Sequence, residues 1–331
     1  MKEKKENKKL TIYEYEEKFS SKENNERAKK VFLVVVFALG ALLLTAMFSL
    51  FKDVYDMNVY AGYVVGGLEI LAFIFFYIAP IVKIKGKQKF EINANAYSVK
   101  KAKKHNQKLR ESLAEKIIDV YLNADCNWYN SERAERLIKA KFNKDSQEIK
   151  EALTEIYQTD VKKAGKDVIL KSAVKSGLYS AVSQKDYTDA LLVAAINLQM
   201  IKDLVFLYGF RPSDAKLVKI YSKVLKNALV AYGMGNIKIG ETVSKTIGGF
   251  VSGIPILGSA IATVVDGSVQ GLANGMLTQV IGRTTVKYLM KEYNLQNVLD
   301  GVEIEPTEEE FTVTCEELKK ALAENNKKKS A

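Results

Sequence analysis

The residue types that carry out most hydrolytic chemistry are scarce in this chain. His105 is its one histidine, and it lies in the lysine-rich stretch KKAKKHNQK. The common Ser and Cys triads need a histidine base, and zinc sites use histidines or closely spaced cysteines. The two cysteines, Cys126 and Cys315, are far apart and show no CxxC spacing. We therefore expect no catalytic triad, no disulfide framework and no metal-binding residues.

The motifs that usually bind nucleotides are also missing from the sequence. There is no GxxxxGK[ST] loop to hold phosphates, and residues 143–145 (NKD) lack the spacing of a guanine-reading NKxD element. Asp160, Asp203 and Asp214 could act as acids or bases, but each has an ordinary explanation on a helix surface. We predict a non-enzymatic protein without a cofactor.

Two apolar segments determine where the remaining residues can lie. Val31–Phe51 holds no charged residue and matches the ~20 residues that a helix needs to cross a bilayer. Tyr60–Ile84 is the second such segment, interrupted only by Glu69 and Lys83. The eight letters KDVYDMNV between them allow only a tight loop. Residues 31–84 are thus predicted to form a transmembrane hairpin, with spans near residues 31–51 and 60–82.

Glu69 is an acid inside the second predicted span, where a carboxylate is costly and suggests a function. Protonation, snorkelling toward the interface or a hydrogen bond to the partner helix would each accommodate it. Because Gly62, Gly66 and Gly67 precede it, helix packing is favoured over ion transport.

Basic residues flank the two spans on one side. Arg27, Lys29 and Lys30 precede the first span, whereas the loop between the spans offers Lys52 against two aspartates. The positive-inside rule then places both termini in the cytoplasm. The lysines after the second span are candidates for contact with anionic phospholipid, worth ~1 kcal/mol each near a charged leaflet. They are Lys83, Lys85, Lys87, Lys89, Lys100, Lys101, Lys103 and Lys104.

The same lysines could instead serve only to set the orientation of the two spans in the membrane. The formal net charge of +11 fits an anionic neighbour, and the bilayer explains it more simply than nucleic acid does. The basic segment lacks interleaved aromatic residues and a nucleic-acid-binding motif, so no nucleic-acid partner is expected.

Beyond the hairpin, apolar residues recur at helical spacing, as Leu109, Leu113 and Ile117 illustrate. Alternating, strand-like runs are nearly absent. The sequence therefore predicts an all-α protein in which a two-helix transmembrane hairpin precedes a cytosolic helical bundle. The predicted parts around the hairpin are a polar tail (1–30), a basic juxtamembrane linker (85–106), a helical domain (107–300) and a charged tail with a short helix (301–331).

Several motifs in the helical domain carry a family resemblance. They are Asp160, the turn Tyr208-Gly209-x-Arg211-Pro212, and the later run 271–282 with Asn274 and Gly275. With the order of parts, they resemble the YcjF-like bacterial inner-membrane family, whose C-terminal domain of unknown function also occurs behind Era-like GTPase domains. The resemblance implies a bacterial inner-membrane location and a GTPase encoded separately, acting in trans.

The motif residues have two interpretations, partner contact or structural turn. They are Tyr208, Gly209, Arg211, Pro212, Asn274 and Gly275. The Arg211 guanidinium could hold a phosphate or a partner carboxylate, or it could bond the open carbonyls of the preceding helix. The Asn274 side chain could likewise cap backbone groups or contact a ligand.

Two functions from different classes follow. The first is a membrane-anchored interaction module that docks a cytosolic partner such as a P-loop GTPase. The second is a membrane-remodelling or permeating protein that inserts its glycine-rich hairpin, residues 247–280. Ile247–Val265 is free of charge, but Pro255 in its middle favours two short buried helices over a membrane segment. Self-association into a homo-oligomer is a further alternative.

Overall fold

The computed structural model describes residues 22–90, 99–123, 129–182, 186–229, 231 and 267–299. Within these ranges every regular element is a helix, so the all-α prediction is confirmed for them. The short helix predicted in the C-terminal tail, most of the N-terminal tail, both cysteines and residues 247–266 lie outside the described residues.

The predicted hairpin is two long helical arms. The first is α2 (Lys22–Met57), and the second runs through α3 (Val59–Phe73), the π-helical turn η1 (Ile74–Ile78) and α4 (Ala79–Gly86). Asn58 alone separates the arms, and its side chain caps α3 by accepting a hydrogen bond from the Ala61 N–H, at 3.0 Å.

Glycines allow the two arms to pack closely against each other. A Cβ atom on Gly62 would lie 2.7 Å from the Tyr55 Cα atom, and one on Gly66 would lie 3.0 Å from the Phe51 ring. Gly67, in contrast, faces open space. One oxygen of Glu69 is shielded from solvent and has no hydrogen-bond partner among the described residues.

The rest of the chain forms a bundle and a smaller group of helices. The elements are α5 (Val99–Asn123), α6 (Ser131–Phe142), α7 (Ser146–Ile156), η3 (Tyr157–Val161), α8 (Lys162–Val182), α9 (Asp186–Tyr208), α10 (Asp214–Leu229) and α12 (Gly267–Leu299). Helix α5 begins inside the predicted linker, before the expected start at residue 107. Lysine is a good helix former, so the helix extends beyond its apolar stripe into the basic stretch.

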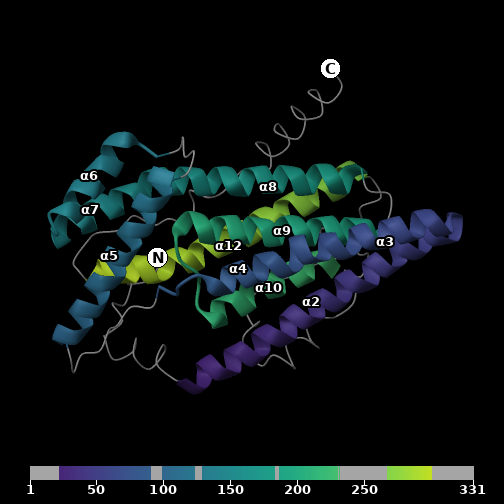
Figure 1. Cartoon of the computed structure of the whole chain (residues 1–331), viewed down its shortest axis with the longest axis horizontal. Helices are drawn as coiled ribbons and strands as arrows, with labels where there is room; N and C mark the ends of the chain where they lie inside the picture. The colour runs from purple at the N-terminus through teal and green to yellow at the C-terminus, as the bar shows by residue number, and fades with distance from the viewer. Residues whose placement is uncertain are drawn as a thin grey trace, which may run out of the picture.

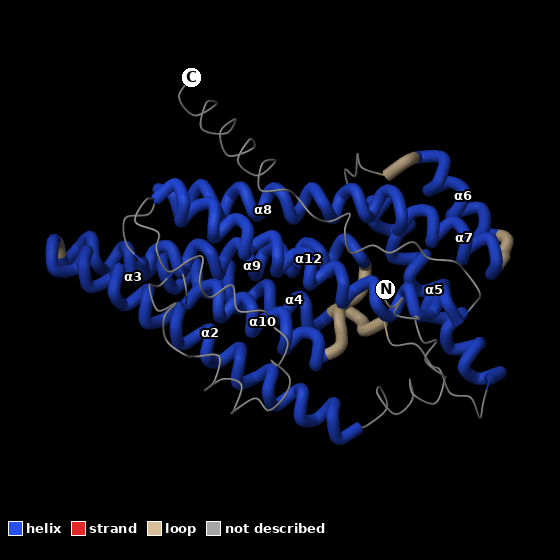
Figure 2. The backbone as a smooth tube through the Cα atoms, turned by 180° about the vertical axis from the view of Figure 1, so that it is seen from behind, coloured by secondary structure: helices blue, strands red, loops and turns tan. Residues whose placement is uncertain are grey.

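The hairpin lies along the bundle and shares its core. Figures 1 and 2 show α2, α3, α4, α8, α9, α10 and α12 side by side, with α5, α6 and α7 gathered at one end. Phe32, on the inner face of α2, meets Tyr221 of α10 edge to face with ring centroids 5.2 Å apart. Val35 and Leu39 of α2 belong to the same buried cluster as the α9 and α10 residues.

Three helical segments are long and apolar enough to cross a membrane, one more than the two predicted spans. They are Glu26–Met57, Val59–Gly86 and Tyr187–Tyr208. The third is essentially α9, and it starts beside the hairpin loop, where the Tyr187 hydroxyl donates to Asp53. The other end of α9 lies near the end of α4, so α9 follows the hairpin over most of its length (Figure 1).

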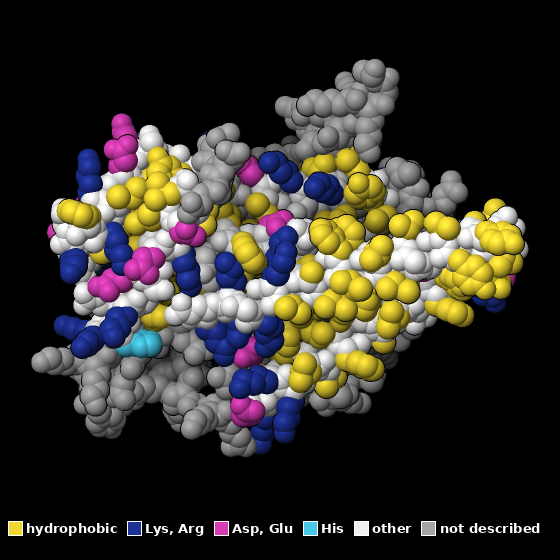
Figure 3. Space-filling model, in the orientation of Figure 1, with side chains coloured by type: hydrophobic (Ala, Val, Ile, Leu, Met, Phe, Trp, Pro, Cys, Tyr) yellow, Lys and Arg dark blue, Asp and Glu magenta, His cyan; other side chains and the backbone are white. Residues whose placement is uncertain are grey.

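The outer surface differs from one side of the bundle to the other. Figure 3 shows apolar side chains covering the hairpin, whereas cationic side chains are spread over the rest of this face. Exposed apolar residues of α2 and α3 include Leu33, Phe37, Phe48, Leu68 and Leu71. The exposed face of α8 instead carries Lys166, Lys171 and Lys175. The apolar part is the surface expected to contact lipid.

Candidate functional site

A buried carboxylate joins the hairpin to the helical bundle. Asp214, the first residue of α10, is only 1% exposed. Its Oδ1 atom lies 2.6 Å from Lys85 Nζ and 3.2 Å from Arg211 Nη1, and its Oδ2 atom lies 2.9 Å from Lys89 Nζ. We refer to these four residues as the Asp214 clamp. It connects residues from the end of the second hairpin arm to the turn between α9 and α10.

The chain reaches this clamp through the predicted Tyr208–Pro212 turn. Gly209 ends α9 with φ of +77°, a left-handed conformation that glycine adopts without strain, and a Cβ there would lie 3.2 Å from a Leu113 methyl. Two residues later the Arg211 N–H donates to the Gln88 carbonyl, at 3.0 Å. The turn is thereby attached to the segment that leaves the hairpin.

Arg211 has a structural role here, with different partners from those expected. Its Nε atom donates to the Lys87 carbonyl, at 3.1 Å, and its Nη1 atom to the Pro212 carbonyl, at 3.1 Å. The carbonyl of Tyr208, at the end of α9, instead accepts a hydrogen bond from the Tyr157 hydroxyl, at 2.6 Å. Arg211 therefore bonds the carbonyl that follows α4, on a different helix from the one predicted.

The clamp has a clear electrostatic consequence. Burial by itself would raise the pKa of the Asp214 carboxyl, but hydrogen bonds from Lys85 and Lys89 and the nearby charge of Arg211 outweigh burial. Together they lower this pKa from 3.8 to about 2. The carboxylate is consequently ionised at neutral pH, and the ion pairs are fully formed.

The predicted lipid-contact lysines divide into groups. Lys85 and Lys89 belong to the clamp, and Lys87 Nζ lies 4.0 Å from the centre of the Phe206 ring. Lys83, Lys103 and Lys104 are exposed. The side chains of Lys100 and Lys101 are outside the described set. Contact of these lysines with phospholipid stays a prediction.

The Asn274 motif lies in a second buried cluster near the other end of α9. Asn274 Nδ2 donates to Asp189 Oδ2, at 3.0 Å, and contacts Ser180 Oγ, at 2.9 Å. The Ser180 hydroxyl also donates to Asp189 Oδ1. Asp189 is 1% exposed, and Ser180, Asn274 and the neighbouring Gly275 are buried as well. We call Ser180, Asp189 and Asn274 the Asp189 cage.

The structure thus separates the two groups of motif residues. Arg211 and its neighbours lie at the clamp, whereas Asn274 and Gly275 lie on α12 at the cage. Asp189 was not singled out from the sequence, although an acid near the start of an apolar helix is a recognisable signal for a polar site. Residues 267–280 of the glycine-rich hairpin begin α12, and Gly271 and Gly275 are buried in the bundle.

The carboxylates considered for catalysis do not come together. Asp160 lies 2.9 Å from Arg133 Nη1, Asp203 lies 3.1 Å from Lys202 Nζ, and Asp214 is in the clamp. Among the described residues, no group of three or more His, Cys, Asp or Glu side chains could hold a metal ion. Each of these acids therefore has its own local partner.

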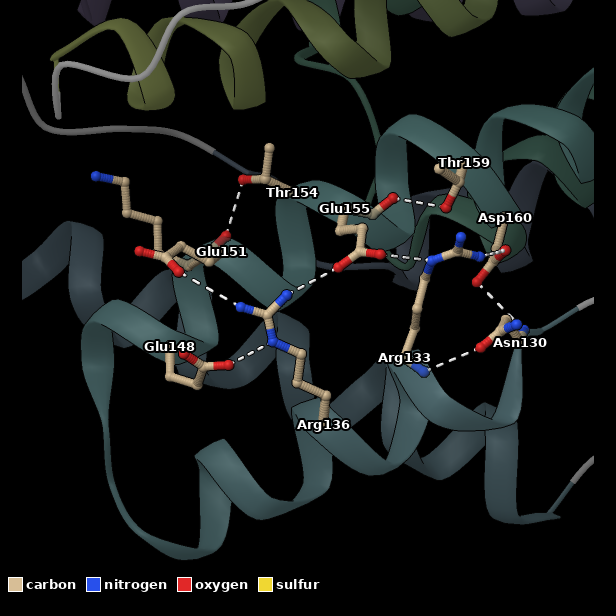
Figure 4. Close-up of polar contacts among 10 residues, drawn as sticks. Asn130, Arg133, Arg136, Glu148, Glu151, Thr154, Glu155, Thr159 and Asp160 are labelled. Carbon is tan, nitrogen blue, oxygen red and sulfur yellow. Dashed lines mark hydrogen bonds and ion pairs between the residues drawn. The ribbon is translucent and has the colours of Figure 1, made fainter.

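A charged network fastens α6 to α7 and η3 (Figure 4). Arg133 Nε lies 2.7 Å from Glu155 Oε1, and Arg136 Nη1 lies 2.9 Å from Glu155 Oε2. Arg136 also pairs with Glu148 and, at 3.4 Å, with Glu151. The hydrogen bond from Arg133 is the main cause of a lowered pKa at Glu155. The network orients one helix against the next at the end of the bundle.

Next to this network the surface is hollowed and mostly acidic. A cavity of 420 Å³ is lined by residues that include Glu132, Glu135, Lys139 and Asp145. Phe142, at the end of α6, is 86% exposed. Aromatic side chains are enriched in protein–protein interfaces.

Comparison with known proteins agrees with a membrane-associated helical domain. Residues 144–300 match the family described as Domain of unknown function (DUF697). A UPF0283 membrane protein of Rhodopseudomonas palustris is 28% identical over 118 residues, a match that spans 35% of this chain and 29% of that relative. No solved structure matches the chain.

The family match starts at the turn before α7 and extends just past α12. It therefore includes Arg211, Asp214, Asp189 and Asn274 but not the hairpin. The narrower likeness to the YcjF-like family stays a prediction. Together, the family match, the membrane-protein relative and the apolar helices support a membrane-associated protein of the DUF697 type.

Proposed function

We propose that the protein is a non-enzymatic interaction module, anchored in the bacterial inner membrane, that docks a separate cytosolic partner such as a P-loop GTPase. The Asp214 clamp is the observation that carries this proposal. It ties the apolar hairpin to the DUF697-type region through a buried carboxylate and three cations. Any partner bound to the helical region would therefore be held at the membrane.

The membrane orientation follows from the lysine-rich end of the hairpin. Lys83, Lys85, Lys87 and Lys89 lie there, so this end faces the cytoplasm and anionic phospholipid. Helices α8 and α9 run in opposite directions, because Gly165 contacts Tyr208 and Ser180 contacts Asp189. The chain thus returns to the lysine-rich end after α9. The last part of α12 lies there too, because the Tyr293 ring is 6.0 Å from the Phe90 ring, and we place both termini in the cytoplasm.

The surface of α6 and α7 is the docking face in this proposal. Its arginine network holds the two helices in a fixed arrangement, and Phe142 offers an exposed aromatic anchor. Acids such as Glu132 and Glu135 outnumber the cations around the hollow. The partner surface is therefore expected to be basic, with an apolar pocket for the ring.

The test is purification of the full-length protein from its native membrane after mild crosslinking. The docking variant combines Phe142→Ser with Glu135→Lys. The control is Lys175→Glu, a change at an exposed position on α8. We expect a P-loop GTPase with the wild type and the control but not with the docking variant. Arg211→Ala is unsuitable as a docking variant, because it would damage the clamp.

A GTPase that binds the docking variant as well as the wild type would refute the α6–α7 face. Recovery of only lipid and further copies of this chain would refute docking and favour self-association. Turnover of a nucleotide or ester by the purified protein alone would contradict the non-enzymatic assignment.

A further inference from the structure

Two lysines from different segments lie close together at the lysine-rich end of the hairpin. Lys87 follows α4, and its Nζ atom lies 4.0 Å from the centre of the Phe206 ring on α9. Lys116 is on α5, and its stem lies against the end of α9, where a Cβ on Gly209 would be 3.9 Å from the Lys116 Cβ. The Gly209 N–H donates to the Phe206 carbonyl, at 3.1 Å, so both lysines contact the same turn of the chain.

Gln88 brings donors of α5 to this place. Lys116 Nζ donates to Gln88 Oε1, at 2.9 Å, and the Ser112 hydroxyl donates to the same oxygen, at 3.4 Å. Ser112 and Lys116 are four residues apart and share a face of α5. Two donors thus converge on one neutral oxygen of the residue next to Lys87. We refer to Lys87, Gln88, Ser112 and Lys116 as the Lys116 site.

The Lys116 site carries two positive charges without acidic partners among the described residues. Glu115, the acid next to Lys116 in the chain, pairs with a lysine of α6 instead. Asp203, on the preceding turn of α9, pairs with an adjacent lysine. Burial is the main cause of a lowered pKa at Lys116, and the positive charge of Lys87 adds to it. An anion bound between the two lysines would relieve this repulsion.

An exposed apolar surface on the second hairpin arm leads to this site. Leu71, Phe75, Ile78 and Val82 recur along the arm, and all four are exposed. The arm ends at Gly86, and Lys87 follows directly. Figure 3 shows cationic side chains adjoining the apolar surface of the hairpin. A phospholipid has the same order of parts, since its acyl chains lie in the hydrocarbon core and its phosphate lies at the interface.

We propose that the Lys116 site binds the phosphate headgroup of an anionic phospholipid whose acyl chains lie along the second hairpin arm. Ammonium, hydroxyl and amide groups all donate hydrogen bonds to phosphate oxygens, and the ammonium bonds are charge-assisted. The adjoining apolar surface favours a lipid over free phosphate. The inference rests on the proposed membrane orientation, and it adds a discrete headgroup site with α5 residues to the general attraction between lysines and the leaflet.

The test is native mass spectrometry of the purified full-length protein in detergent, with phosphatidylglycerol, phosphatidylcholine or inorganic phosphate added. We expect the wild type to retain phosphatidylglycerol more tightly than phosphatidylcholine, because the choline group cancels the phosphate charge. Lys87→Met combined with Lys116→Met should weaken phosphatidylglycerol binding by about 30-fold, which is about fivefold for each lysine.

Lys103→Met combined with Lys104→Met is the matched control. It removes the same charge from two exposed lysines, and Lys104 is about 18 Å from Lys116 along α5. This control should bind phosphatidylglycerol like the wild type. Lys87→Arg combined with Lys116→Arg keeps both charges and should also retain binding, because arginine is a good phosphate ligand.

Three results would overturn the proposal. They are equal retention of the two phospholipids by the wild type, an equal loss in the control and the methionine variant, and loss of binding in a folded arginine variant. Displacement of phosphatidylglycerol by an equal concentration of inorganic phosphate would assign the site to free phosphate and overturn the lipid assignment.

The docking variant, Phe142→Ser with Glu135→Lys, separates this inference from the proposed function. Both of its changes are on α6, outside the Lys116 site. It should therefore bind phosphatidylglycerol like the wild type. Failure of partner docking would leave this result unchanged, whereas failure of the headgroup site would appear in the wild type as equal retention of the two phospholipids.

Discussion

Asp214 and Asp189 are both 1% exposed and lie near opposite ends of α9, but the two differ in the hydrogen-bond partners seen around them. Asp214 is surrounded by two lysines and an arginine. Asp189 accepts hydrogen bonds from a serine hydroxyl and an asparagine amide, which are neutral donors. The same residue type therefore serves as one half of an ionic clamp at one end and as the centre of a polar cage at the other.

The two aspartates fasten different sets of helices. An aspartate whose charge is balanced by cations on other segments holds those segments together, because removing it leaves the cations unpaired. The clamp accordingly supports the proposed anchoring role, whereas the cage holds α8, α9 and α12 together.

The largest expected effect is at the clamp. Asp214→Asn keeps the shape of the side chain but leaves Lys85, Lys89 and Arg211 without their counter-charge. We expect a loss of about 3 kcal/mol in unfolding free energy, the low end for a broken buried ion pair, because both lysines still reach water. Denaturant unfolding in detergent measures it. A loss no larger than that of an exposed substitution such as Lys175→Glu would remove the distinction between the two aspartates.

The cage should respond less strongly. Asn274→Ala removes a neutral donor and leaves part of the Asp189 carboxylate unsatisfied, which costs about 1–3 kcal/mol. Asp189→Asn tests the same contact from the other side. Because Asn274 and Asp189 are in contact, the double variant should be destabilised by less than the sum of the single variants. Additive losses would show that the two side chains are not coupled.

The pH dependence of stability tests the ion pairs of Asp214. The pKa of Asp214 is lowered from 3.8 to about 2 in the folded protein. A carboxyl whose pKa is lower in the folded than in the unfolded protein stabilises the fold at pH values above its unfolded-state pKa. This stabilisation is lost as the pH falls from about 4 through 2. We expect the wild type to lose about 2 kcal/mol relative to Asp214→Asn over this range. Parallel pH profiles for the two proteins would contradict the clamp.

The smallest effect is expected beside the clamp. Lys87→Met keeps the aliphatic stem but removes the charge that lies 4.0 Å from the centre of the Phe206 ring. The expected loss is about 0.5–1 kcal/mol, typical of an exposed cation–π contact. Phe206→Leu should produce a similar loss. Adding Lys87→Met to the Phe206→Leu variant should then cause no further loss of stability. A clearly larger loss would mean that Lys87 shares the clamp's role.

Pattern and composition were enough to predict the helical class and the apolar hairpin. The 21 uncharged residues of Val31–Phe51 have few alternatives to a long helix, and the short loop forces the arms together. The extra apolar helix was harder to recognise as a membrane candidate, because Lys202 and Asp203 interrupt its hydropathy near one end. Only the tertiary structure shows that this helix runs alongside the hairpin.

The site residues were predicted as a list but not as an arrangement. Arg211 and Asn274 stood out because they lie in the motifs that resemble those of the YcjF-like family. Nothing in their spacing showed that Arg211 would bond the Lys87 carbonyl, 124 residues earlier in the chain. The basic residues after the second span were interpreted as lipid ligands because charge patterns record sign and position but not the partner.

The sequence by itself determined the elements of this protein, since helix formation and membrane affinity depend on local composition and periodicity. Only the tertiary structure decided which charges are paired and which oxygens are buried without a partner. Those properties depend on contacts between segments far apart in the chain. Asp189 and Asp214 look alike in the sequence, and it is the packing of α4, α8 and α12 around α9 and α10 that gives them different chemistry.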